Sequence, residues 1–181
     1  PDVEQSLQYL SRMRDTVDDM PRIEIDSKSV WYHGSPKANE ISEFNISGGE
    51  LGNGVYFTKS RPLAENYARP RGEVKNMASA KALSGVIEAR LPKLKEMTKQ
   101  EFLDGRSAFY TAEQKINKGV WSRQVAVDAE AKYQQSISDE GFHGISVEGE
   151  NQAVLFDPSS VKVVDGGAFA NKEIIKQQSK Y

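Results

Sequence analysis

The architecture of this chain follows from three motifs: His33-Gly34-Ser35, Gly52-Asn53-Gly54-Val55-Tyr56-Phe57 and Ala64-Glu65-Asn66-Tyr67. The first motif ends a predicted strand, since residues of high β propensity precede it and Pro36 follows it in a turn. The second leads from clustered glycines into another strand, and the third lies on a short helix that Ser60 would cap. Together they place one histidine, one glycine and two tyrosines in an order suited to holding a flat ring that carries an amide.

Length and composition indicate one globular domain. The chain has 181 residues, of which 38% are hydrophobic and 28% charged. That is enough for a sizeable core and too apolar for a disordered protein. The net charge of -2 gives no sign of a broadly basic surface for nucleic acid. Because the chain has no cysteine, disulfides, thiolate catalysis and cysteine zinc sites are excluded.

The chain lacks the sequence features of a membrane-spanning helix and of a signal peptide. No apolar run approaches the roughly 18 residues of a transmembrane helix, and no apolar segment follows a basic start. We therefore expect neither a membrane-spanning helix nor an ordinary signal peptide. The absence of cysteine fits a reducing compartment, and it also fits a protein that is exported through a secretion channel.

The chain is expected to have three segments. Residues 3–17 carry apolar side chains at helical spacing, and Pro21 ends that predicted helix. Residues 1–28 would therefore form an N-terminal helical arm. Residues 29–165 would form the main domain, and residues 166–181 a polar C-terminal tail.

Beyond residue 84, the predicted strands and helices alternate irregularly. The pairs Thr98/Glu101 and Thr111/Gln114 have capping-box spacing, which predicts a short helix from the first pair and a longer helix from the second, to about Asp139 with a break near Gly119. Strands are expected at residues 85–91, 145–147, 153–156 and 161–164. This order favours an α+β fold with mostly antiparallel pairing over a doubly wound parallel sheet.

Several kinds of catalytic chemistry have no motif in this chain. His33 and His143 are the only histidines, and without HxxxH or HxH spacing they predict no metal site. Neither a GxSxG nucleophile elbow nor a GxxxxGK or GxGxxG phosphate loop occurs. His33 alone could equally be structural, and Tyr56 and Tyr67 alone would more often be core aromatics. Their combination favours a ligand site.

These motifs resemble the catalytic domain of poly(ADP-ribose) polymerases, on the diphtheria-toxin side of the ADP-ribosyltransferase superfamily. That family carries His-Gly-Ser at a strand end, Gly-x-Gly-Ile-Tyr-Phe on the next strand and Asn-Tyr on a helix, and Tyr56 and Tyr67 keep its separation of eleven positions. The later segment Asn151-Gln152-Ala153-Val154-Leu155-Phe156-Asp157 resembles the strand with the family's catalytic glutamate. Residues 85–157 are also similar to small ADP-ribosyltransferase-like domains of phages and mobile elements. The resemblance implies split, mostly antiparallel sheets with flanking helices.

The resemblance also implies that the chain binds NAD⁺ as its substrate. Gly34 would offer its backbone N–H and C=O to the nicotinamide amide, where a side chain would block the approach. Tyr56 and Tyr67 would sandwich the cationic pyridinium ring. His33 would hydrogen-bond the adenosine ribose, and Ser35 would add a hydroxyl contact. His33 and Tyr56 would serve catalysis as well as binding.

The chain departs from the family pattern at two positions. Ala64 stands where the family often has a serine that bonds the nicotinamide amide, a loss of about 1 kcal/mol. Gln152 stands at the position of the catalytic glutamate. A glutamine keeps the hydrogen bond to the ribose hydroxyl but lacks the negative charge and cannot act as a base.

Three interpretations of this second departure follow. Gln152 can suffice for slow or mono-ADP-ribosyl transfer. Alternatively, Glu150 or Glu148 supplies the carboxylate, since a regular strand would place both on the same face as Gln152. Glu150 would then lie about 6.5 Å back along the strand, which is too far unless the strand bulges. In the third interpretation, the domain binds its ligand without turnover.

The expected function is mono-ADP-ribosyl transfer from NAD⁺ to a macromolecule, more readily a protein than a nucleic acid. The resemblance implies a monomeric phage protein or bacterial toxin or effector, delivered into the cytoplasm of a host cell by a phage or a secretion system. The alternatives are a catalytically silent module that binds NAD⁺ or ADP-ribose, and an NAD⁺ glycohydrolase toxin. An RNA phosphotransferase of related fold is disfavoured by the near-neutral charge.

Overall fold

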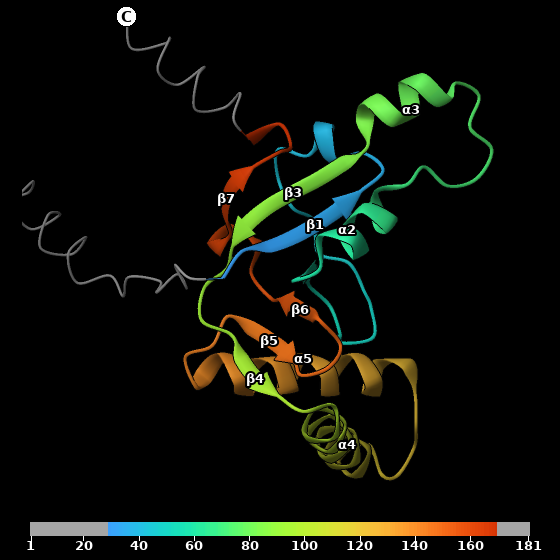
Figure 1. Ribbon diagram of the computed structural model, residues 1–181. Helices are drawn as coiled ribbons and strands as arrows, with labels where there is room; N and C mark the ends of the chain where they lie inside the picture. Colours follow the sequence, from blue (N-terminus) through green and yellow to red (C-terminus); the bar gives the residue numbers. More distant parts are fainter. Residues whose placement is uncertain (1–28, 170–181) are drawn as a thin grey trace, which may run out of the picture.

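Seven strands form one mixed sheet in residues 29–169, the part of the chain that the computed structural model describes (Figure 1). They are β1 (Trp31–Ser35), β2 (Val55–Thr58), β3 (Gly85–Arg90), β4 (Lys95–Met97), β5 (Gly144–Val147), β6 (Gln152–Leu155) and β7 (Lys162–Asp165). Their order is β4-β5-β6-β2-β1-β3-β7, and every pair is antiparallel except β4–β5. The expected α+β class with mostly antiparallel pairing is confirmed. The helix predicted at residues 3–17 lies outside the described residues.

The sheet is most weakly joined between β1 and β2. These two strands share a single register pair, Tyr32 with Thr58. By contrast, β1 pairs with β3 along its whole length, from Trp31 to Ser35, and β2 pairs with β6 along all of Val55–Thr58. The expected split of the sheet corresponds to this joint, because β1 has no register partner in β2 beyond Tyr32.

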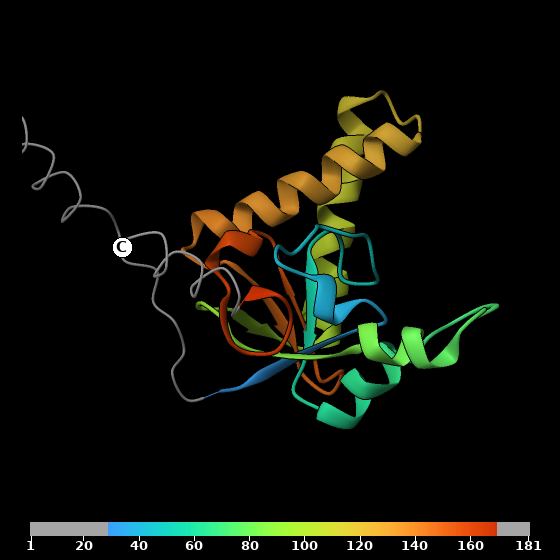
Figure 2. The same cartoon turned by 90° about the horizontal axis from the view of Figure 1, so that it is seen from above.

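Four α-helices accompany the sheet in the described part of the chain. They are α2 (Arg61–Ala68), α3 (Met77–Leu83), α4 (Lys99–Ile116) and α5 (Arg123–Asp139), with 3-10 turns η1 (Ala38–Glu40) and η2 (Pro158–Ser160). Viewed from above, α4 and α5 lie together on one side, away from α2 and α3 (Figure 2). Helix α2 begins where the sequence predicts, since the Ser60 side chain accepts a hydrogen bond from the Leu63 N–H.

Helix α2 approaches β1 closely at Gly34. A Cβ atom on Gly34 would lie 1.7 Å from the carbonyl oxygen of Ala64, which is itself fully buried. The sequence analysis explained this glycine by access of a ligand to the backbone. The structure adds a packing reason, because the direction that a side chain would take is filled by the backbone of α2.

The helix start predicted at Thr111 is wrong, whereas the break predicted near Gly119 is confirmed, because it lies between the end of α4 at Ile116 and the start of α5 at Arg123. The capping box at Thr98 and Glu101 is present, but α4 runs through Thr111 to Ile116, and α5 begins after a different cap, Ser122. Helix α4 continues through Gly105, where a Cβ would lie 2.5 Å from the hydroxyl oxygen of Tyr133 in α5. Packing against α5 thus offsets the cost of about 1 kcal/mol for a glycine within a helix.

Two elements carry no clear signal in the sequence. Helix α3 has no buried residue, so it shows no apolar periodicity; its cap is Asn76, whose side chain accepts from the Ser79 N–H. Strand β4 has three residues and is ordered by parallel pairing with β5, from Lys95 with Ile145 to Met97 with Val147. Such pairing depends on a segment that is distant in sequence and is therefore invisible to local patterns.

The interior consists of two apolar clusters. One contains Trp31, Phe44, Phe57 and Ile87, and the other lies around Tyr133 on the α4 and α5 side. The first residues of the predicted tail also contact this body. Phe169 packs on Phe44 with ring centroids 5.1 Å apart, and the Ala168 N–H donates to the Ile41 carbonyl at 2.8 Å.

Gly34→Ala is expected to destabilise the protein by about 3 kcal/mol or more, because the new methyl group would overlap a backbone oxygen that cannot rotate away. Denaturant unfolding of the purified protein measures this. Gly85→Ala is the matched control on the neighbouring strand, since a Cβ there has its nearest neighbours at 3.6 Å. It should change the free energy of unfolding by less than about 1 kcal/mol, and equal effects of the two variants would contradict the packing argument.

Candidate functional site

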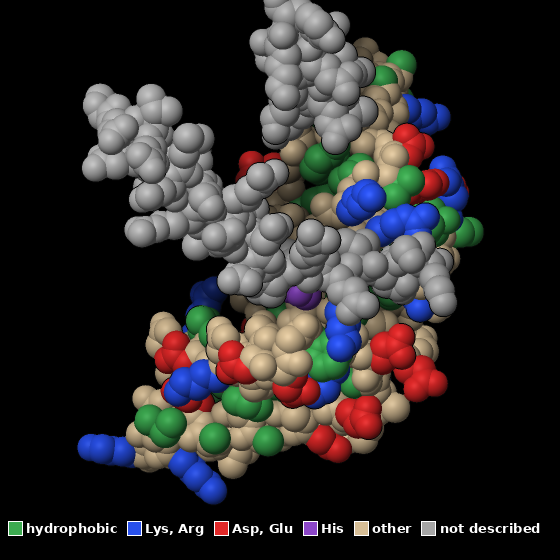
Figure 3. Space-filling view, turned by 90° about the vertical axis from the view of Figure 1, so that its left-hand side faces the viewer, with side chains coloured by type: hydrophobic (Ala, Val, Ile, Leu, Met, Phe, Trp, Pro, Cys, Tyr) green, Lys and Arg blue, Asp and Glu red, His purple; other side chains and the backbone are tan. Residues whose placement is uncertain are grey.

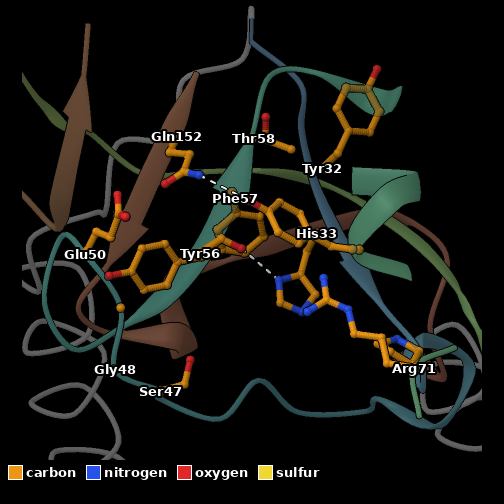
Figure 4. A pocket seen from close by; sticks show the side chains of 14 residues that line it. Tyr32, His33, Ser47, Gly48, Glu50, Tyr56, Phe57, Thr58, Arg71 and Gln152 are labelled. Atoms are coloured by element: carbon orange, nitrogen blue, oxygen red, sulfur yellow. Dashed lines mark hydrogen bonds between the residues drawn. The ribbon is translucent and has the colours of Figure 1, made fainter. Parts of the chain in front are cut away.

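A cavity of about 670 Å³ lies between β1 and β2, a volume typical of a site for a nucleotide-sized ligand (Figure 4). Its walls come from both strands, from the loop before β2, from α2 and the segment that follows it, and from the start of β6. The sequence-predicted residues that line it are His33, Gly34, Tyr56, Tyr67 and Gln152. Residues far apart in the sequence therefore meet at one cavity.

Tyr56 is held by the loop that precedes its own strand. Its hydroxyl donates to the Gly52 carbonyl at 2.6 Å and accepts from the Leu51 N–H at 3.0 Å. A Cβ on Gly49 would lie 2.4 Å from the Tyr56 ring, so only glycine lets the loop pass this close. Burial raises the pKa of the Tyr56 hydroxyl above its ordinary value, which keeps it a neutral donor at physiological pH.

His33 presents one free ring nitrogen to the cavity. Its Nδ1 lies 2.8 Å from the Tyr56 carbonyl oxygen, and because a carbonyl only accepts, Nδ1 carries the hydrogen. The ring packs between Phe44 and Phe57, at centroid distances of 5.2 and 5.6 Å. Burial lowers the pKa of His33, and the hydrogen bond to Tyr56 offsets this only in part. At neutral pH the imidazole is therefore neutral, and Nε2 is a hydrogen-bond acceptor.

Tyr67 and Gln152 meet across the cavity. Tyr67 lies in the last turn of α2 with 42% of its surface exposed, and its hydroxyl accepts a long hydrogen bond of 3.4 Å from the Gln152 Nε2. Gln152 is the first residue of β6 and pairs with Thr58 of β2. Ala64, three positions before Tyr67, is buried and contributes no polar group to the cavity wall.

The other predicted site residues lie elsewhere. The Ser35 hydroxyl accepts from the Lys37 N–H at 3.2 Å, and Ser35 does not line the cavity. The Glu150 carboxylate accepts from the Lys99 ammonium at 2.7 Å. Glu148 lines a second, separate cavity.

The expectation that Glu148, Glu150 and Gln152 share one face of a strand is wrong. Strand β6 begins only at Gln152, and the residues before it form a turn with positive φ at Gly149 (80°) and Asn151 (50°). The period of two that relates side chains along a strand does not extend through such a turn.

The cavity has charged lining residues that the sequence analysis did not identify. Glu50 is the only carboxylate and Arg71 the only lysine or arginine among the described residues that line it. Figure 4 shows Glu50 near Tyr56 and Gln152, and Arg71 on the side of His33. Glu50 stands in a glycine-rich loop and Arg71 in a segment without periodicity, so neither had a local signal. Thr58 and Tyr32 also line the cavity.

The described residues show no arrangement for a metal or a membrane. No three His, Asp or Glu side chains within residues 29–169 are grouped so as to hold a metal ion. None of the helices in this range combines the length and the apolar character needed to cross a bilayer.

Comparison with protein families agrees with this fold and cavity. Residues 27–171 match the family described as "ADP-Ribosyltransferase in polyvalent proteins". The match covers most of the chain, so the protein belongs to this ADP-ribosyltransferase family, and the resemblance drawn from the motifs is confirmed. No curated protein and no solved structure matches the chain.

Tyr56→Phe should loosen the loop without removing the ring from the cavity. The substitution deletes the acceptor of the Leu51 N–H and the donor to the Gly52 carbonyl. A cost of about 1–3 kcal/mol is expected, together with faster hydrogen exchange of the Leu51 amide. Tyr67→Phe is the control, since its hydroxyl makes only the long bond to Gln152. Unchanged exchange at Leu51 in Tyr56→Phe would contradict this anchoring role.

Acidification should destabilise the protein through His33. The unfolded chain takes up a proton near the ordinary histidine pKa of 6.5, whereas folded His33 has a lowered pKa and resists protonation. Its contribution to stability is full above pH 6.5 and is lost as the pH falls through the folded-state pKa. Urea unfolding at a series of pH values measures the slope, and NMR titration of the ring measures the pKa directly. His33→Gln should remove this part of the slope; a slope unaltered by the substitution would exclude the mechanism.

Proposed function

We propose that this protein is an NAD⁺-dependent mono-ADP-ribosyltransferase that cleaves the nicotinamide–ribose bond and transfers ADP-ribose to a macromolecular acceptor. The observation that carries the proposal is the meeting of His33, Gly34, Tyr56, Tyr67 and Gln152 at one cavity in a chain of this family. Neither the cavity beside Glu148 nor the one beside Phe44 is lined by any of these five residues.

The charges around the cavity match the charges of NAD⁺. The ligand carries a positive pyridinium ring and a negative pyrophosphate. Glu50 lies at the end with Tyr56 and Gln152, and Arg71 lies on the side of His33 (Figure 4). We therefore place the nicotinamide between Tyr56 and Tyr67, and the adenosine ribose and pyrophosphate toward His33 and Arg71.

Each side chain would have one task in this pose. The Nε2 of His33, an acceptor at neutral pH, receives a hydrogen bond from a ribose hydroxyl. The backbone of Gly34 holds the nicotinamide amide at the open side of β1, beyond its last register pair with β2. Gln152 bonds the hydroxyl of the nicotinamide ribose. Such remote contacts hold the dinucleotide bent and favour bond cleavage through an oxocarbenium-like state.

We propose that the acceptor is a protein. Acidic and basic side chains are interspersed on the face shown in Figure 3, without a broad patch of one sign that would suit a phosphate backbone. Single transfer fits Gln152 better than polymer formation, since a glutamine cannot activate a ribose hydroxyl as a base. We further propose that the protein is a monomeric phage or bacterial effector that acts in the cytoplasm of a host cell; its family is described from polyvalent proteins.

A second candidate function is binding without turnover, and Gln152 at the position of the family's glutamate favours it. A silent module would bind NAD⁺ and raise the melting temperature while releasing no nicotinamide. A glycohydrolase would release nicotinamide with water alone and label no acceptor.

The test measures nicotinamide release from NAD⁺ by the purified protein, with and without a bacterial lysate, together with labelling of lysate proteins. Release that depends on lysate and yields a labelled protein is expected. Gln152→Ala should abolish it, and Tyr67→Ala should weaken NAD⁺ binding about tenfold through loss of ring stacking. Trp121→Ala removes an aromatic side chain that is 67% exposed outside the cavity and should change nothing. Binding of NAD⁺ without any release would contradict the transferase and support the silent module.

A further inference from the structure

The cavity needs a negative charge that Gln152 cannot supply. When the bond between C1′ of the ribose and the nicotinamide nitrogen breaks, the positive charge moves from the pyridinium ring to C1′ and the ribose ring oxygen. A nearby carboxylate stabilises that charge more in the transition state than in the ground state. Glu50 is the only carboxylate among the described cavity-lining residues, and Glu150 is engaged by Lys99 outside the cavity.

The loop that carries Glu50 is fixed at both of its ends. Ser47 and Gly54 exchange two backbone hydrogen bonds, of 2.9 and 3.0 Å. Between them, the Gly52 N–H donates to the Gly49 carbonyl at 3.1 Å. The hydroxyl of Tyr56 ties the same turn to β2. The hydrogen bonds therefore fix the loop in place as one wall of the cavity.

The long helices hold this loop from outside. The guanidinium of Arg106 in α4 donates to the Glu50 carbonyl at 3.1 Å, and the side-chain amide of Gln134 in α5 donates to the Asn53 carbonyl at 2.8 Å. Arg106 also lies 3.8 Å from the Glu130 carboxylate, which balances its charge. The backbone of Glu50 is thus positioned by α4. In residues 29–169 its carboxylate forms no ion pair within 4.0 Å, and it interacts with the Lys99 ammonium only at longer range.

The direction of the side chain suits a role beside Gln152. In Figure 4 the Glu50 side chain leaves the loop on the side of Tyr56 where Gln152 lies. Both residues line the same cavity. In the pose proposed above, this is the position of the nicotinamide ribose and not of the pyrophosphate, which lies toward Arg71.

We propose that Glu50 is a catalytic carboxylate of this site, supplying from the loop before β2 the negative charge that the first residue of β6 lacks. This inference rests on the proposed function. The C1′–N bond breaks, and its electron pair leaves with neutral nicotinamide. Glu50 stabilises the ribosyl cation without bonding to it. The acceptor nucleophile forms the new bond at C1′ and releases its proton to water.

Glu50→Gln tests the proposal, because it removes the charge and keeps the shape. We expect kcat for nicotinamide release to fall on the order of 100-fold, while KM for NAD⁺ rises much less, because Glu50 also faces the pyridinium charge of bound NAD⁺. Adding Gln152→Glu to this variant should restore much of the lost rate by returning a carboxylate to the same ribose. Glu43→Gln is the matched control on the same connection between β1 and β2, since Glu43 is exposed and lies outside the cavity.

A binding measurement makes the test independent of turnover. Calorimetry would compare ADP-ribose with an analogue whose terminal ribose ring oxygen is replaced by a protonated nitrogen, a mimic of the ribosyl cation. The wild-type protein and Glu43→Gln should prefer the cationic analogue at least about tenfold, and Glu50→Gln should lose that preference. A preference that survives in Glu50→Gln would overturn the inference, even if kcat falls, because the loss of rate would then come from the loop.

The binding measurements also distinguish a failure of the proposed function from a failure of the role of Glu50. A wild-type protein that binds neither NAD⁺ nor the cationic analogue would overturn the proposed function, and the role of Glu50 with it. A wild-type protein that binds NAD⁺ and prefers the cationic analogue equally with and without the Glu50 carboxylate would overturn the role of Glu50 alone.

Discussion

The cavity depends on Tyr56, which organises three of its walls through different parts of one residue. Its backbone carbonyl accepts from His33 and fixes which ring nitrogen remains free. Its hydroxyl bonds Leu51 and Gly52 and holds the loop that carries Glu50. Because one half-buried tyrosine links β1, β2 and this loop, the positions of the candidate ligand-binding groups are coupled, and disturbing the loop also affects the ring that lines the cavity.

The weak joint of the sheet explains why a cavity can exist at this point. A sheet that paired β1 and β2 along their full lengths would use their backbone groups in the ladder. Here the two strands share only the register pair of Tyr32 with Thr58. Strand β1 is instead supported by α2, whose backbone at Ala64 packs directly against Gly34. The α4 and α5 helices reach the same site indirectly, since Arg106 and Gln134 hold the loop before β2.

Local patterns predicted those elements whose signals are complete within a few residues. Strands β1, β2 and β3 have residues of high β propensity beside turn-forming residues, although their partner strands are distant in the chain. The Ser60 cap of α2 and the capping box of α4 have their hydrogen-bond partners three residues away. The start predicted at Thr111 failed because α4, which packs against α5, continues through this residue to Ile116. The shared face expected for Glu148, Glu150 and Gln152 failed because the turn before β6 breaks the period of a strand.

The sequence by itself determined the α+β class, the family, and the identity and order of the motif residues, since residue types and their spacing are properties of the chain. The tertiary structure decided which carboxylate lies at the cavity. No neighbour in the sequence distinguishes Glu50, which lines the cavity. Glu148 and Glu150 are close to Gln152 in the sequence, but Glu148 lines a different cavity and Glu150 pairs with Lys99. The physical reason is that backbone hydrogen bonds join segments that are distant in the sequence. These bonds bring side chains together in space, whatever their separation along the chain.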